Sequence, residues 1–185
     1  MRKTIEVVSK LAQQGVIKRY AIAGAVAALN YIEPALTEEL DVLISFADFE
    51  KRESGLILLK PIEKALAEIG FSKRTNVGYL IEEWPVQFIP VASALDEEAL
   101  DQANEIDIGL TGDPPLTARC LRAEHIVATA VKLGRLKDWA RIEAFLNQKA
   151  VDLTALRDVL ERHALMDAWK NFCLKSGIKD PLAVG

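Results

Sequence analysis

Residues 37–44, TEELDVLI, contain the pattern that most directly indicates the fold of this chain. Apolar residues at positions 40, 42 and 44 alternate with residues 39, 41 and 43, which predicts a strand within residues 36–46. Side chains of a strand alternate between its two faces, so Glu39 and Asp41 are expected on the same face, a few ångströms apart. The two acids are either a metal-binding pair or ordinary acids on the exposed side of a strand.

The segment before this strand predicts a buried strand, a glycine and a helix. The run YAIAG, residues 20–24, is apolar and too short for a helix, and AVAALNYI, residues 25–32, has helix-forming composition. Gly24 lies between them, where a residue without a side chain allows close approach of the backbone.

Periodicity along the rest of the chain predicts an α/β or α+β core followed by helices. In the first part we expect helices over residues 3–14, 57–69 and 96–104, strands from FSKRT, VGYLIEE and PVQFIPV, and an extended piece over 116–121. Four helices are expected after that, over 123–133, 136–146, 153–162 and 164–174. The predicted organisation is therefore a core domain over residues 1–121 and a C-terminal helical region over 122–185.

Composition excludes several classes of protein. The chain has 185 residues, half of them hydrophobic, and a formal net charge of −4, so extended non-specific nucleic-acid binding is not expected. No apolar run approaches the roughly 20 residues that span a bilayer, and the start of the chain lacks a secretory signal, so we expect a cytoplasmic protein without a membrane partner. Cys120 and Cys173 are isolated and are expected to be buried free thiols.

Four segments, in this order, resemble the nucleotidyltransferase fold of the DNA polymerase beta superfamily, in its small bacterial branch of AbiEii-like and antitoxin-type proteins. YAIAGAVAALNY resembles the strand, Gly-Gly and helix of that family, with Gly24 at the first glycine and Ala25 where a second glycine or serine usually stands. LTEELDVLI resembles the strand that carries two acids, here Glu39 and Asp41. WPVQFIPV resembles the strand of the third carboxylate, and AEHIVATAVKLGRLKDWARI resembles the helical Lys…Arg-x-Lys-Asp segment.

This resemblance implies a mixed sheet flanked by helices and followed by a helical bundle, and it implies a chemistry. Glu39 and Asp41 would hold Mg²⁺ for a nucleoside triphosphate, while Gly24 and Ala25 would approach its phosphates. Arg135 and Lys137 would add positive charge to the phosphates. The protein would transfer a nucleoside monophosphate to an acceptor, which the sequence leaves open as a protein, an RNA or another molecule.

Gln87 departs from the family pattern, because it stands where the third carboxylate is expected. An amide can coordinate a metal through oxygen but cannot serve as a general base. This argues for slow, altered or absent transfer, unless Asp48 or a residue of the helical region reaches the site.

Other interpretations remain open. In these alternatives Glu39 and Asp41 form a solvated strand face and Gly24 closes a loop. Arg135, Lys137 and their neighbours then form a salt-bridged helix surface. At the level of function, the alternatives are a catalytically degenerate binding protein or toxin–antitoxin component, and a protein interaction module. The sequence leaves the nucleotide preference and the oligomeric state open.

Overall fold

The computed structural model describes residues 1–33, 37–45, 59–107 and 115–183. These residues form six strands, β1 (Tyr20–Ala23), β2 (Leu40–Ile44), β3 (Tyr79–Ile81), β4 (Trp84–Pro90), β5 (Asn104–Asp107) and β6 (Thr117–Cys120). Within the same ranges lie eight helices, α1 (Arg2–Gln13), α2 (Gly24–Ala28), α3 (Lys60–Glu68), α4 (Ala94–Asp101), α5 (Ala123–Leu133), α6 (Leu136–Asn147), α7 (Leu153–Arg162) and α8 (Met166–Ser176). No helix in these ranges combines the length and the apolar character needed to cross a bilayer.

The chain forms two compact units. The first contains Met1–Val26 and Leu36–Leu121, and the second contains Ala27–Ala35 and Arg122–Gly185. The second unit therefore includes a short segment that begins within α2, at Ala27, in addition to the residues expected after position 121.

The strands of the first unit form one mixed sheet in the order β3-β4-β2-β1-β6-β5. The central strands β1 and β2 are antiparallel, whereas β2 with β4 and β1 with β6 are parallel. The outer strands β3 and β5 each pair antiparallel with their neighbour. This arrangement of a mixed sheet with helices confirms the predicted fold class.

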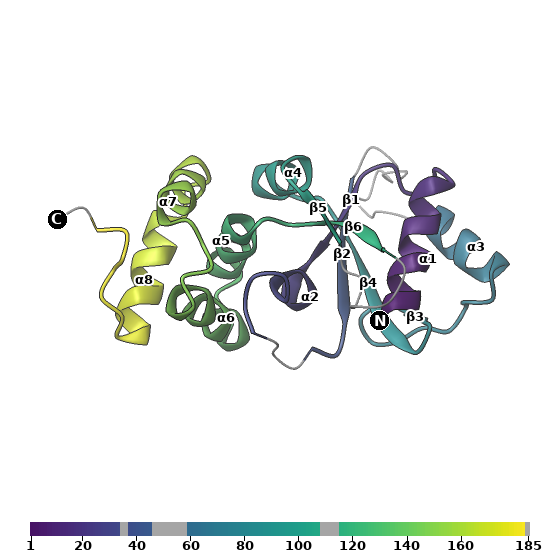
Figure 1. The fold of residues 1–185 in the computed structure, drawn as a ribbon, viewed down its shortest axis with the longest axis horizontal. Helices are drawn as coiled ribbons and strands as arrows, with labels where there is room; N and C mark the ends of the chain where they lie inside the picture. The colour runs from purple at the N-terminus through teal and green to yellow at the C-terminus, as the bar shows by residue number, and fades with distance from the viewer. Residues whose placement is uncertain (34–36, 46–58, 108–114, 184–185) are drawn as a thin grey trace, which may run out of the picture. The chain divides into compact units, whose positions relative to one another are not determined.

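Helices α1 and α3 lie together on one face of the sheet (Figure 1). The amphipathic pattern of α1 buries Ile5, Val8 and Leu11, because apolar residues three or four positions apart share one side of a helix. Thr4 Oγ1 donates a hydrogen bond of 3.2 Å to the carbonyl of Ile81 in β3, which also connects α1 to the sheet.

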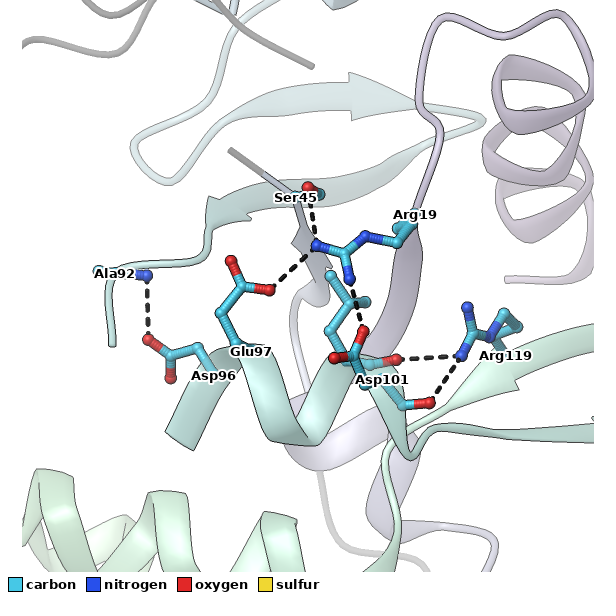
Figure 2. A network of polar contacts seen from close by, with 8 residues as sticks. Arg19, Ser45, Ala92, Asp96, Glu97, Asp101 and Arg119 are labelled. Carbon is cyan, nitrogen blue, oxygen red and sulfur yellow. Dashed lines mark hydrogen bonds and ion pairs between the residues drawn. The ribbon is translucent and has the colours of Figure 1, made fainter. Parts of the chain in front are cut away.

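Helix α4 lies on the other face and is tied to the sheet by arginines (Figure 2). Arg19, which directly precedes β1, donates to Glu97 Oε2 at 3.0 Å and to Ser45 Oγ at 3.1 Å, and it also pairs with Asp101. Arg119 of β6 donates to the carbonyl of Leu100 at 3.0 Å. The arginines thus hold the middle and the C-terminal end of α4 against strands that are distant in sequence.

The second unit is a helical bundle around buried aromatic side chains. Phe145 of α6 and Trp169 and Phe172 of α8 are almost fully buried, and the rings of Trp169 and Phe172 are 5.5 Å apart. Helices α5, α6 and α7 match the predicted ranges closely, whereas α8 begins at Met166, two residues later than expected. Cys120 and Cys173 are both buried thiols outside any disulfide, as predicted.

Three sequence expectations about the first unit are wrong. FSKRT forms no strand and contributes only an isolated bridge between Arg74 and Tyr79. The helix expected over residues 96–104 ends at Asp101, and its predicted end is replaced by the edge strand β5. The helix expected over residues 25–32 is α2, which has only five residues and ends at Ala28.

Candidate functional site

The carboxylate of Asp41 lies against the backbone of Gly24. Gly24 follows β1 directly and has φ +60°, a left-handed conformation that glycine adopts readily. A Cβ atom at this position would lie 3.0 Å from Asp41 Cγ and 3.3 Å from Asp41 Cβ, and well inside van der Waals contact with Oδ2. Position 24 therefore requires glycine for its conformation and also for the space that the carboxylate occupies.

Strand register explains this contact. Ala23, the last residue of β1, pairs with Asp41 near the start of β2 in the antiparallel ladder. The chain turns into α2 directly after Ala23, so the backbone of Gly24 meets the Asp41 side chain at this edge of the sheet. Sequence reasoning placed Gly24 and Asp41 in one site but did not predict that they touch.

Gln87 is the partner of Asp41 on the other side of β2. The parallel pairing of β2 with β4 aligns these two residues, and paired residues project from the same face of a sheet. Asp41 and Gln87 are both half-buried, whereas Val86 and Phe88 are buried on the opposite face. The structure thus places the residue at the expected third-acid position directly beside Asp41.

Glu39 is half-buried and lies one residue before β2. Its carbonyl accepts a hydrogen bond of 3.1 Å from Thr37 Oγ1. The strand is shorter at this end than predicted, so Glu39 belongs to the segment leading into β2. Whether the side chains of Glu39 and Asp41 lie on the same face, as expected for residues two positions apart in a strand, stays a prediction.

Ala25 is half-buried within the short helix α2. A helix of five residues has a small macrodipole, since the dipole is the sum of aligned peptide units. An anion at this position would therefore be bound by contact with the backbone of Ala25, with little contribution from the helix dipole.

The donor set suits a hard divalent cation. Mg²⁺ commonly takes one or two protein carboxylates and completes its octahedron with water and phosphate oxygens, and Glu39 and Asp41 supply two carboxylates. The space over Gly24 that a Cβ would fill is occupied by the Asp41 carboxylate. In the described part of the chain, no group of three or more Asp, Glu, His or Cys residues is arranged to hold a metal ion. Asp48, the alternative third acid, lies outside the described residues.

Arg135 and Lys137 lie in the second unit, at the start of α6. The Arg135 guanidinium donates two hydrogen bonds to the carboxylate of Asp138, from Nε to Oδ2 at 2.6 Å and from Nη2 to Oδ1 at 3.1 Å. Asp138 is fully buried, and Arg141 approaches it at 3.6 Å. This geometry favours the salt-bridge interpretation for Arg135, and a contribution of Arg135 and Lys137 to phosphate binding stays a prediction.

Comparisons with known proteins bear on the fold. No protein-family model matches the sequence, and no curated protein matches it either. A solution structure of the antibiotic-resistance factor ANT(2'')-Ia is 16% identical, with a TM-score of 0.52, and the match covers 90% of this chain and 97% of that one. A crystal structure of ANT(2'')-Ia in complex with adenylyl-2''-tobramycin is 14% identical, with a TM-score of 0.50 and coverages of 89% and 98%.

A third similar structure is that of an antigenic nucleotidyltransferase-like protein from Paracoccidioides brasiliensis. It is 14% identical, with a TM-score of 0.56, and the match covers 93% of this chain and 86% of that one. At such low identities these similarities show the fold alone, which this chain shares with the nucleotidyltransferase-like protein. The resemblance to the AbiEii-like and antitoxin-type branch stays a prediction.

Proposed function

We propose that this protein binds a nucleoside triphosphate with Mg²⁺ beside Gly24 and Asp41, where β1 ends and β2 begins, and transfers a nucleoside monophosphate to an acceptor. The observation that carries the proposal is the Asp41 carboxylate packed against the backbone of a left-handed Gly24, at the end of a central strand. The nucleotidyltransferase fold supports it.

In this proposal each residue has a separate role. Asp41 and Glu39 hold the cation, which neutralises phosphate charge when bound. Gly24 and Ala25 offer their main chain to the phosphates, Ala25 with only a methyl group in the way. At Gly24 the missing side chain leaves room for the Asp41 carboxylate beside the backbone. Gln87, beside Asp41, offers an amide oxygen to the cation or an N–H group to a phosphate.

A second candidate function is nucleotide binding without transfer, as a degenerate member of the fold or as a toxin–antitoxin component. The observation that favours it is the alignment of Gln87 with Asp41, because an amide at this position cannot accept the proton of an attacking hydroxyl. A protein interaction module is the third candidate, and it requires neither nucleotide nor magnesium.

Calorimetric titration with each of the four nucleoside triphosphates tests the proposed site. We expect binding that requires Mg²⁺ and is lost in Glu39→Ala/Asp41→Ala. Glu38→Ala is the matched control, since Glu38 is exposed and adjacent to the pair. Binding that ignores both magnesium and the double substitution would remove the metal site. No binding of any of the four triphosphates would leave the interaction module as the better description.

Transfer is tested separately, with triphosphate labelled at the α-phosphate and incubated with cell extract. The products are separated into protein, RNA and small-molecule fractions, the last because one structure of similar fold holds the modified small molecule adenylyl-2''-tobramycin. Label that reaches a fraction only with the wild-type site supports transfer. A protein that binds nucleotide but transfers label only after Gln87→Asp supports the second candidate.

A further inference from the structure

The surroundings of Asp41 within the sheet are poor in acids. Its two paired neighbours are Ala23, a methyl group, and Gln87, a neutral amide. The next pairs along the strands on the same face are formed by Leu43 with Ala21 and with Ile89, which are apolar. Within the described strands, therefore, Asp41 is the single carboxylate among the paired residues Ala23, Asp41 and Gln87, and the next pairs on that face contain none.

Strand β4 brings no carboxylate to this face. Its sequence, WPVQFIP, contains no acid, and the nearest acids in sequence, Glu82 and Glu83, form the turn before it. Glu83 precedes Gln87 by four positions, and strand residues rise by about 3.3 Å each, which places the turn roughly 13 Å along the strand. A Mg²⁺ ligand must lie about 2 Å from the ion, so these acids cannot share a cation with Asp41.

Among the residues that the structure describes, the available ligands therefore suit one cation. Glu39 and Asp41 provide the two carboxylates that one Mg²⁺ commonly takes from a protein, and the phosphates and water complete the octahedron. In sites that hold two divalent ions, the ions lie roughly 3.5–4 Å apart, and their mutual repulsion is four times that of unit charges. A second ion beside Asp41 would meet the neutral oxygen of Gln87 where a carboxylate would supply a full negative charge.

We propose that the site formed by Glu39 and Asp41 binds one divalent cation per bound nucleotide. The neutral Gln87 amide, which replaces a carboxylate beside Asp41, is the reason that a second cation does not bind. This inference rests on the proposed nucleotide site and adds its cation stoichiometry. It assigns to Gln87 a specific part: it limits the site to one ion while leaving a polar group that can contact the nucleotide.

The experiment counts bound Mn²⁺ by electron paramagnetic resonance, with an α,β-methylene triphosphate that cannot be cleaved between those phosphates. The nucleotide is equimolar with the protein, and binding of the nucleotide is first established by calorimetry. We expect one Mn²⁺ per wild-type protein, and two in Gln87→Asp or Gln87→Glu, with the spin coupling of neighbouring ions. Gln14→Asp is the matched control, since it adds the same charge at an exposed position at the end of α1, and it should retain one ion.

The outcomes separate this inference from the function on which it rests. Two ions in the wild type would overturn the stoichiometry while the nucleotide site stands. One ion in the wild type and also in both folded Gln87 variants would show that Gln87 does not limit the count. Failure of the nucleotide itself to bind in calorimetry would remove the proposed site, and the inference with it.

Discussion

Gly24→Ala is the substitution whose cost the structure allows us to work out most fully. A left-handed backbone costs an L-residue about 1–2 kcal/mol relative to glycine, and Gly24 has φ +60°. The new Cβ must also displace the Asp41 carboxylate, and inserting a methyl group into a packed site adds about 1–3 kcal/mol. We therefore expect a loss of about 2–5 kcal/mol in the free energy of unfolding.

A matched glycine separates the two contributions. Gly15 lies in the same unit with φ +73°, and an added Cβ there would meet no atom within 4 Å, so Gly15→Ala should cost only the backbone term, about 1–2 kcal/mol. In an Asp41→Ala background, Gly24→Ala should approach the Gly15 value, because Asp41 Cγ and Oδ2 are gone. The coupling energy should then be at least about 1 kcal/mol, above the error of additive sites.

Urea denaturation followed by circular dichroism measures all four variants against wild type, with the slope m held as a check on the denatured state. Equal costs for Gly24→Ala and Gly15→Ala, together with a coupling energy below about 0.5 kcal/mol, would refute the close contact between Gly24 and Asp41.

Three further predictions concern other contacts. Asp138→Asn should lower the unfolding free energy by about 2 kcal/mol, because Asp138 is buried and its carboxylate accepts hydrogen bonds from the charged Arg135. Asp158 is exposed, so Asp158→Asn should change the unfolding free energy by less than about 0.5 kcal/mol in the same urea assay. Arg19→Met should cost about 1 kcal/mol in low salt, because its partners on α4 are half-exposed, and the loss should shrink in 1 M NaCl; no salt dependence would contradict an ionic contribution. Burial, and secondarily a nearby carboxylate, raises the pKa of Cys173 from 9.0 to about 11, so the unfolded thiol ionises first and stability should fall as pH rises from about 9 to 11. Cys173→Ala should show a shallower fall, measured by denaturation at each pH, and an unchanged slope would exclude this thiol as a source.

The helices of the second unit were predictable because their signals are local. Asp152 accepts hydrogen bonds from the amides of Thr154 and Ala155 and starts α7. Gly134 ends α5 in a left-handed conformation. A cap and an apolar stripe are both contained in a few consecutive residues, so these helix boundaries can be predicted from the local sequence.

The edge of the sheet was less predictable because its strands depend on distant partners. Strand β5 contains one half-buried apolar residue, Ile106, and becomes a strand by pairing with β6. FSKRT resembles a strand in composition, yet Arg74 makes only a bridge to Tyr79. Pairing between segments separated by a helix or a loop leaves no periodic trace in either segment.

The same distinction applies to the candidate site. The alternation of residues 39–44 was sufficient to predict that Asp41 lies on the face opposite Leu40, Val42 and Ile44. The contact with Gly24 and the alignment with Gln87 depend on the registers of β1–β2 and β2–β4, which no local pattern specifies. The residues were therefore found from the sequence, whereas their mutual geometry required the structure.

The position of β1 in the sheet has a consequence for the order of folding. On one side it pairs with β2, which is close in sequence, so Ile22 meets Val42; on the other it pairs with β6, so Ile22 also meets Cys120 near the end of the first unit. Contacts between distant residues form late, because the long loop between them must first be closed. The β1–β2 ladder is therefore expected to form early, and β6 with its edge partner β5 to join last. In native-state hydrogen exchange, amides of β5 and β6 should then open at lower free energy than those of β2, so that one sheet contains an early half and a late half that meet along β1.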